Sequence, residues 1–183
     1  MLTQQHGAIR RGLQLVLFVA ALCMIPAGIA AQSSEQPSSF VGDVAKQVLL
    51  DPTTYAPAII GYDATIRDWK TSQPFFRNGF MERNSRFTAT GLPYGPPLSY
   101  SEGNRQIALD ALTNLSSSIL NNVVDRSVER MLLKAHPEHR KLIRTLGWVE
   151  RISFGITMSY VLSAEHYRQA QLNTRLADQL GLK

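Results

Sequence analysis

The stretch KAHPEHRK, residues 134–141, decides how this chain of 183 residues folds. Proline disfavours a helical backbone at the residue before it and fits the first turn of a new helix, where its missing N–H costs little. Glu138 would lie in that first turn, where the helix dipole favours a negative charge. The stretch therefore predicts a helix that ends in a cap at His136, a second helix that begins at Pro137, and a surface position for His139.

Long helices are predicted on both sides of this turn. Ser99 and Glu102 have the spacing of a capping box, which predicts the start of the first helix. Apolar residues then recur at helical spacing up to residue 135 and again from about residue 142 to 170. They are Ala108, Leu112, Leu115, Ile119 and Val123, with Leu120, Val124, Val128 and Met131 beside them, and then Leu142, Leu146, Val149, Ile156, Tyr160, Tyr167 and Ala170.

Residues 40–98 are rich in proline, which limits the length of any helix there. A short helix is predicted over 40–51, a second over 57–73 with Pro57 in its first turn, and a loop over 89–103. The predicted fold class is mainly α: a long antiparallel helical hairpin over 99–183, preceded by shorter N-terminal helices and a Pro/Gly-rich loop.

The N-terminus has the pattern of a secretory signal peptide over 1–31. Arg10 and Arg11 precede the apolar run Leu13–Ile25, and small residues follow. An uncleaved membrane anchor is the alternative, because the apolar run is nearly long enough to cross a bilayer. Residues 32–39 are predicted to be a flexible spacer and 40–183 a single helical domain. We therefore expect an exported protein of the periplasm or cell envelope, with Cys23, the one cysteine, lost with the signal.

The charge balance argues against a nucleic-acid partner. Removing Arg10 and Arg11 from 19 basic residues leaves 17 against 14 acidic ones, a net charge of +3, which is a weak basic footprint for such a partner. Basic residues do concentrate around the predicted turn. A charged surface corner explains them, and attraction to an anionic membrane surface is the alternative; they are Arg126, Arg130, Lys134, Arg140, Lys141 and Arg144.

A polar stripe follows the first long helix. It consists of Asp110, Asn114, Ser117, Asn121, Asp125 and Glu129, at steps of three or four. Two interpretations stay open: a solvated face, or a seam that fixes the register between the two long helices. If the chain reverses near residue 136, the seam places Asp125 and Glu129 near Arg144 and Arg151. It also places Asn121 and Asn122 near Glu150.

A catalytic or metal site has little support in the sequence. The same register brings Asp110 close to Glu165 and His166, but adjacent residues on a helix point about 100° apart, unlike the Glu-x-x-His repeats of helical two-metal sites. His136 and His139 lie roughly 40 Å along the helix from His166 and lack a third ligand. We therefore assign no catalytic, cofactor-binding or metal residue, and expect no cofactor.

One stretch carries a resemblance. Asp68, Thr71 and Ser72, followed by Gly79, Glu82, Asn84 and Ser85, resemble the pattern Asp-x-x-Thr-Thr … Gly-x-x-Glu-x-Asn-Pro. That pattern is typical of a family of small helical bacterial proteins of unknown function, many of them embedded in the membrane. Ser72 replaces a threonine and Ser85 the proline. The resemblance implies a helical fold and membrane association, and no activity.

Three functions follow in order. The first is an exported, non-catalytic helical envelope protein that acts through protein–protein contacts or self-association. The second is a membrane-embedded or membrane-associated helical protein; the charged residues within 106–125 and 145–164 count against embedding. The third is a helical metal-dependent enzyme that uses Asp110, Glu165 and His166.

Overall fold

The computed structural model describes residues 37–182, with side chains from residue 41 onward. The predicted signal peptide 1–31 and most of the predicted spacer lie outside the described residues. Residues 40 onward form one compact unit. Its helices are α2 (Pro37–Leu50), α3 (Ala56–Arg77), α4 (Tyr100–Ala135) and α5 (Arg140–Leu180), with single turns of 3₁₀-helix at Pro52–Thr54, Ser85–Phe87 and Pro137–His139. The mainly α fold class is confirmed.

Local sequence signals set the helix ends. Ser99 caps α4, and its backbone N–H donates to Glu102 while its hydroxyl accepts from the Glu102 N–H, so the predicted capping box is present. α4 ends at Ala135 with His136 as its C-cap, and Pro137 opens the 3₁₀ turn that leads into α5. His139 is exposed, as predicted. α3 begins one residue before Pro57 but runs through Pro74 to Arg77, beyond its predicted end.

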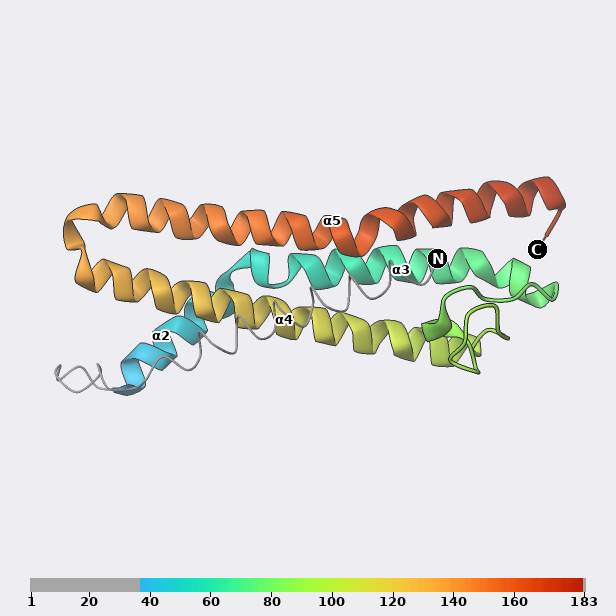
Figure 1. Ribbon diagram of the computed structural model, residues 1–183, viewed down its shortest axis with the longest axis horizontal. Coiled ribbons are helices and arrows are strands. Elements are labelled where there is room, and N and C mark those ends of the chain that lie inside the picture. The colour runs from blue at the N-terminus through green and yellow to red at the C-terminus, as the bar shows by residue number, and fades with distance from the viewer. Residues whose placement is uncertain (1–36, 183) are drawn as a thin grey trace. The chain divides into compact units, whose positions relative to one another are not determined.

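A third helix enters between the two long ones. α4 and α5 lie together beside the turn at Pro137, and α3 then lies between them along the rest of their course (Figure 1). Gly61 on α3 marks this close approach, because a Cβ there would lie 3.1 Å from Leu162 of α5 and 3.9 Å from Asn114 of α4. The sequence predicts two long helices and shorter ones before them; it does not predict that α3 fits between the two.

The buried faces of the long helices differ from the expected apolar ones. Leu112, Leu120, Met131, Leu142, Leu146, Val149, Ile156 and Tyr160, expected to define the apolar faces, are all exposed. Small and polar residues are buried instead: Ser118 and Asn122 on α4, and Arg151, Gly155, Ser159 and Ser163 on α5. Small residues allow α3 to approach α4 and α5 closely, and large side chains at the same positions would hold the helices apart.

A conventional apolar cluster closes the other end of the unit. Trp69 of α3, Phe87 of the loop and Ile107 of α4 are buried together, with Ile66, Phe76 and Leu98 packed against them. The loop 78–99 is held by two isolated bridges, between Glu82 and Gly95 and between Thr88 and Pro97. This cluster fixes the loop against the first turns of α4.

Candidate functional site

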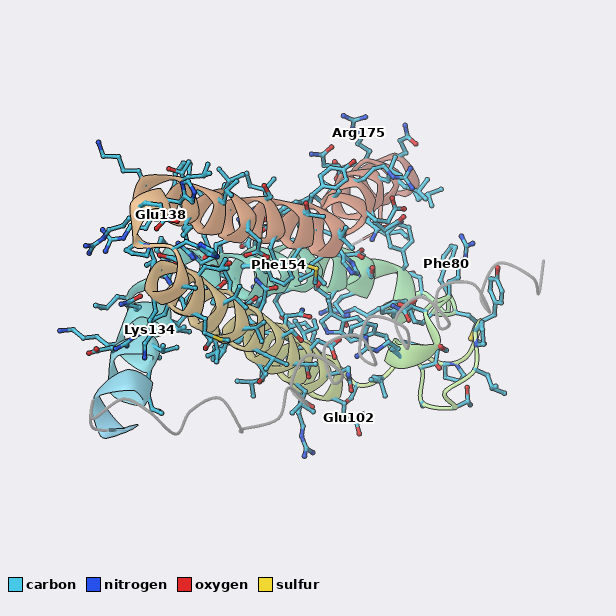
Figure 2. The ribbon with its side chains drawn as sticks, turned by 60° about the vertical axis from the view of Figure 1, so that its left-hand side comes forward. Phe80, Glu102, Lys134, Glu138, Phe154 and Arg175 are labelled. Carbon is cyan, nitrogen blue, oxygen red and sulfur yellow. The ribbon has the colours of Figure 1, made fainter. Side chains whose placement is uncertain are left out.

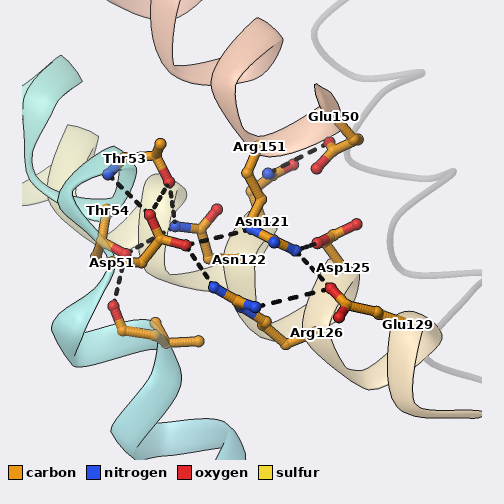
Figure 3. A network of polar contacts seen from close by, with 11 residues as sticks. Asp51, Thr53, Thr54, Asn121, Asn122, Asp125, Arg126, Glu129, Glu150 and Arg151 are labelled. Atoms are coloured by element: carbon orange, nitrogen blue, oxygen red, sulfur yellow. Dashed lines mark hydrogen bonds and ion pairs between the residues drawn. The ribbon is translucent and has the colours of Figure 1, made fainter. Parts of the chain in front are cut away.

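A buried ion-pair network joins the helices near the turn (Figure 3). The Arg151 side chain is 4% exposed and contacts three carboxylates. Its Nε lies 3.2 Å from Asp51, and its Nη1 donates to Glu129 at 2.9 Å and to Asp125. Arg126 donates to Asp51 at 2.8 Å. Three carboxylates therefore share two guanidinium groups, and each guanidinium offsets a charge that is costly to bury alone.

Neutral side chains extend the network toward α2. Asn122, fully buried, donates from Nδ2 to the Thr54 hydroxyl at 2.7 Å, and Thr54 donates to the backbone carbonyl of Val48 at the same distance. Beside Arg151, Asn121 Nδ2 lies 3.5 Å from Glu150. The seam register thus predicts two contacts correctly: Arg151 with Asp125 and Glu129, and Asn121 with Glu150. The solvated-face interpretation is wrong for Asp125 and Glu129, which face inward.

The outer surface of α4 carries no exposed charge over 108–128. The acidic and basic residues of this stretch, Asp110, Asp125 and Arg126, are all partly buried and paired. The exposed positions are Ala108, Leu109, Leu112, Thr113, Ser116, Ser117, Leu120 and Val128. Charged side chains become exposed again only beyond the ends of this stretch, for example at Arg105.

The outer surface of α5 follows the same rule over 145–164. Its exposed positions are Thr145, Leu146, Trp148, Val149, Glu150, Ser153, Ile156, Thr157, Tyr160 and Val161, so that Glu150 is the one exposed charge in this stretch. Ile156 is 66% exposed at its centre. The two stretches together, 108–128 and 145–164, are here called the uncharged band.

Opposite ends of the band carry different charge. The turn end holds the six basic residues singled out from the sequence, with Lys134 and Glu138 projecting from it (Figure 2). The far end exposes both signs, with Glu102 and Arg105 on α4 and the ion pair between Glu165 and Arg168 on α5. Polar groups therefore lie inside the helices, apolar groups outside, and an excess of cations at one end.

A cleft of about 560 Å³ lies at the far end, between α3, α5 and the loop. Asp68 lies in its wall, where its carboxylate contacts His166 Nδ1 at 2.8 Å and accepts from Asn173 Nδ2 at 3.2 Å. Asn173 also donates to the Ser72 hydroxyl at 2.9 Å. Glu82 and Asn84 line the same cleft. Tertiary packing thus gathers around one cleft four residues of the pattern noted in the sequence.

Two residues of that pattern have clear local roles. Gly79 has φ 84°, in the left-handed region that favours glycine, immediately after α3 ends. Glu82 accepts from the Asn84 N–H at 2.6 Å. Burial raises the pKa of Glu82, and the nearby charge of Asp68 raises it further, so the folded protein favours the protonated form of Glu82.

The residues considered for a metal site do not form one cluster. Asp110 pairs with Arg86 of the loop and Gln106 of its own helix, Glu165 pairs with Arg168, and His166 pairs with Asp68. Asp110 and His166 line one small pocket of about 220 Å³, but no hydrogen bond or ion pair joins them. Over residues 37–182, no group of three His, Cys, Asp or Glu side chains is placed to hold a metal ion.

Comparison with protein-family models, curated proteins and solved structures finds no match to this chain. Within the described residues, none of the helices combines the length and the hydropathy that crossing a membrane requires.

The buried role of Arg151 is the main feature that sequence reasoning did not single out. A signal for it exists: Gly147, Arg151, Gly155, Ser159 and Ser163 recur every four residues and so share one face of α5. A row of small residues with one arginine marks a face that packs closely against other helices.

Proposed function

We propose that this chain is a membrane-associated helical protein whose uncharged band contacts lipid. The observation that carries the proposal is the inverted distribution of polarity: carboxylates and guanidinium groups pair inside, while the outward positions of 108–128 and 145–164 are apolar or neutral apart from Glu150. In water this arrangement gains little, because large apolar side chains stay hydrated while polar ones are buried.

The dimensions of the band support a lipid environment. At 1.5 Å per residue, its 20 or 21 residues extend for about 30 Å, which matches the hydrocarbon thickness of a bilayer. Small residues on the inward face of α5 are the kind that fills helix contacts in lipid, where burying apolar side chains between helices brings no gain over contact with lipid. The charges within the band, which count against embedding when the sequence is read alone, are paired with each other.

The charge at the ends also supports the proposal. The turn end carries Arg140, Lys141 and Arg144 on exposed positions, and cations near a membrane surface are attracted by anionic headgroups. Trp148 lies between this basic end and the centre of the band and is 59% exposed. Tryptophan is enriched at that depth, between headgroup and hydrocarbon.

Alkaline carbonate washing of isolated cell membranes tests the proposal. We expect the chain to stay with the membrane pellet, because apolar contact with lipid survives high pH while electrostatic adsorption does not. Release of the wild-type chain into the wash would contradict lipid contact through the band. It would instead favour an exported envelope protein whose apolar surface is covered by another protein or a second copy.

A pair of lysine substitutions locates the contact. Ile156→Lys places a charge at the centre of the band and should weaken membrane partition by about 3 kcal/mol, roughly a hundredfold. Leu172→Lys is the matched control, since Leu172 is exposed on the same helix beyond the band. We expect membrane retention to fall for Ile156→Lys and to stay unchanged for Leu172→Lys; equal retention of both variants would refute the assignment of the band.

A further inference from the structure

An open cleft of about 720 Å³ lies among α2, α4 and α5 at the basic end. Five arginines and two carboxylates line it, together with apolar atoms of Val44, Leu133 and Trp148. The arginines are Arg126, Arg130, Arg140, Arg144 and Arg151, and the carboxylates are Asp43 and Glu129. Its lining therefore has an excess of positive charge.

The five arginines divide into engaged and available ones. Arg126 and Arg151 are committed to the buried network, and Arg130 lies 3.3 Å from Asp43. Arg140 and Arg144 are exposed, and neither has an ion pair or hydrogen bond through its side chain within residues 37–182. They are four residues apart on α5 and so present their guanidinium groups on one face.

Trp148 continues the same row, one turn beyond Arg144. Along α5 the cleft thus presents two available guanidinium groups, then an exposed indole, then the uncharged band with Ile156 at its centre. A phospholipid has the same order along its length: phosphate, glycerol and acyl chain. Arginine matches phosphate in particular, because its planar fork donates two parallel hydrogen bonds.

We propose that this cleft binds the phosphate of an anionic phospholipid headgroup, with Arg140 and Arg144 donating to its oxygens and Trp148 against the upper acyl chain. The proposal rests on the membrane association inferred above and makes it specific: it names the lipid class and the residues that select it.

The emission of Trp148 in the full chain measures this binding. Trp148 and Trp69 are the two tryptophans, and Trp69 is buried in the apolar cluster, so a blue shift on adding vesicles reports on Trp148. We expect the protein to bind vesicles containing phosphatidylglycerol more tightly than vesicles of phosphatidylcholine alone. Changing both Arg140→Gln and Arg144→Gln should weaken binding to the anionic vesicles by about 30-fold, from the usual contribution of a cation near such a surface.

Arg105→Gln with Arg175→Gln is the matched control. It removes the same charge from exposed positions on the same two helices, and Arg175 lies near the far end of α5, away from Lys134 and Glu138 (Figure 2). We expect less than a threefold effect for this pair. An equal loss for both double variants would overturn the site, because binding would then follow net charge alone.

Two further outcomes separate this proposal from the one it rests on. Tight binding to both kinds of vesicle that ignores Arg140→Gln and Arg144→Gln would overturn the headgroup site and leave membrane association standing. No binding to any vesicle, with a Trp148 response to inorganic phosphate that needs the same two arginines, would overturn membrane association and assign the cleft to a soluble phosphate.

Discussion

Removing Arg151 should destabilise the protein more than any other single change in its charged residues. Arg151→Met keeps most of the side-chain volume, but it leaves Asp51, Asp125 and Glu129 with Arg126 as the remaining cation of the network. Breaking a buried ion pair by removing one partner costs about 3–5 kcal/mol. Because three carboxylates lose one of two guanidinium groups, we expect the free energy of unfolding to fall by the upper part of that range.

Urea unfolding of the purified variants, followed by far-UV circular dichroism, measures this loss. Arg168→Met is the control: it removes an exposed arginine of the same helix that pairs only with exposed Glu165, and it should leave the unfolding midpoint unchanged. Combining Arg151→Met with Asp125→Asn should cost less than the sum of the single changes, because the second change removes one of the uncompensated charges.

The reasoning would be refuted by a loss of less than about 1 kcal/mol for Arg151→Met, the range of exposed pairs. Strict additivity of the double variant would likewise show that Arg151 and Asp125 do not act together.

Three further changes test local features by the same unfolding assay. Gly103→Ala should cost about 1–3 kcal/mol, because the new Cβ would overlap the buried Trp69 ring; Gly42→Ala, with open space around it, should instead stabilise by up to about 1 kcal/mol, and the reverse order would contradict the packing. Ser99→Ala should cost about 1 kcal/mol by removing the cap of α4. Glu82 has a raised pKa in the folded state, so its contribution to stability is full below the unfolded pKa of about 4.3 and is lost as pH rises through the folded value; Glu82→Gln should therefore be more stable than the wild type at pH 7 and lose this advantage in acid, and a pH-independent difference would contradict the burial of Glu82.

Part of the candidate site could be predicted from the sequence alone. The seam register places Asp125 and Glu129 opposite Arg151, because a reversal at Pro137 fixes which turns of two helices lie side by side close to it. The same register fails for Asp110 and His166. Far from the turn, α3 separates the helices, and Asp68 of that helix takes the place predicted for Asp110 beside His166.

The sequence determines by itself the helical class and the helix boundaries at Ser99, His136 and Pro137. Caps and prolines act through the backbone of their own neighbours, so their effect needs no distant contact. Tertiary structure alone decides which face of each helix is buried. Spacing shows that Arg151, Gly155 and Ser159 share a face, but only the entry of α3, more than 70 residues earlier in the chain, makes that face the interior and turns the apolar side chains outward.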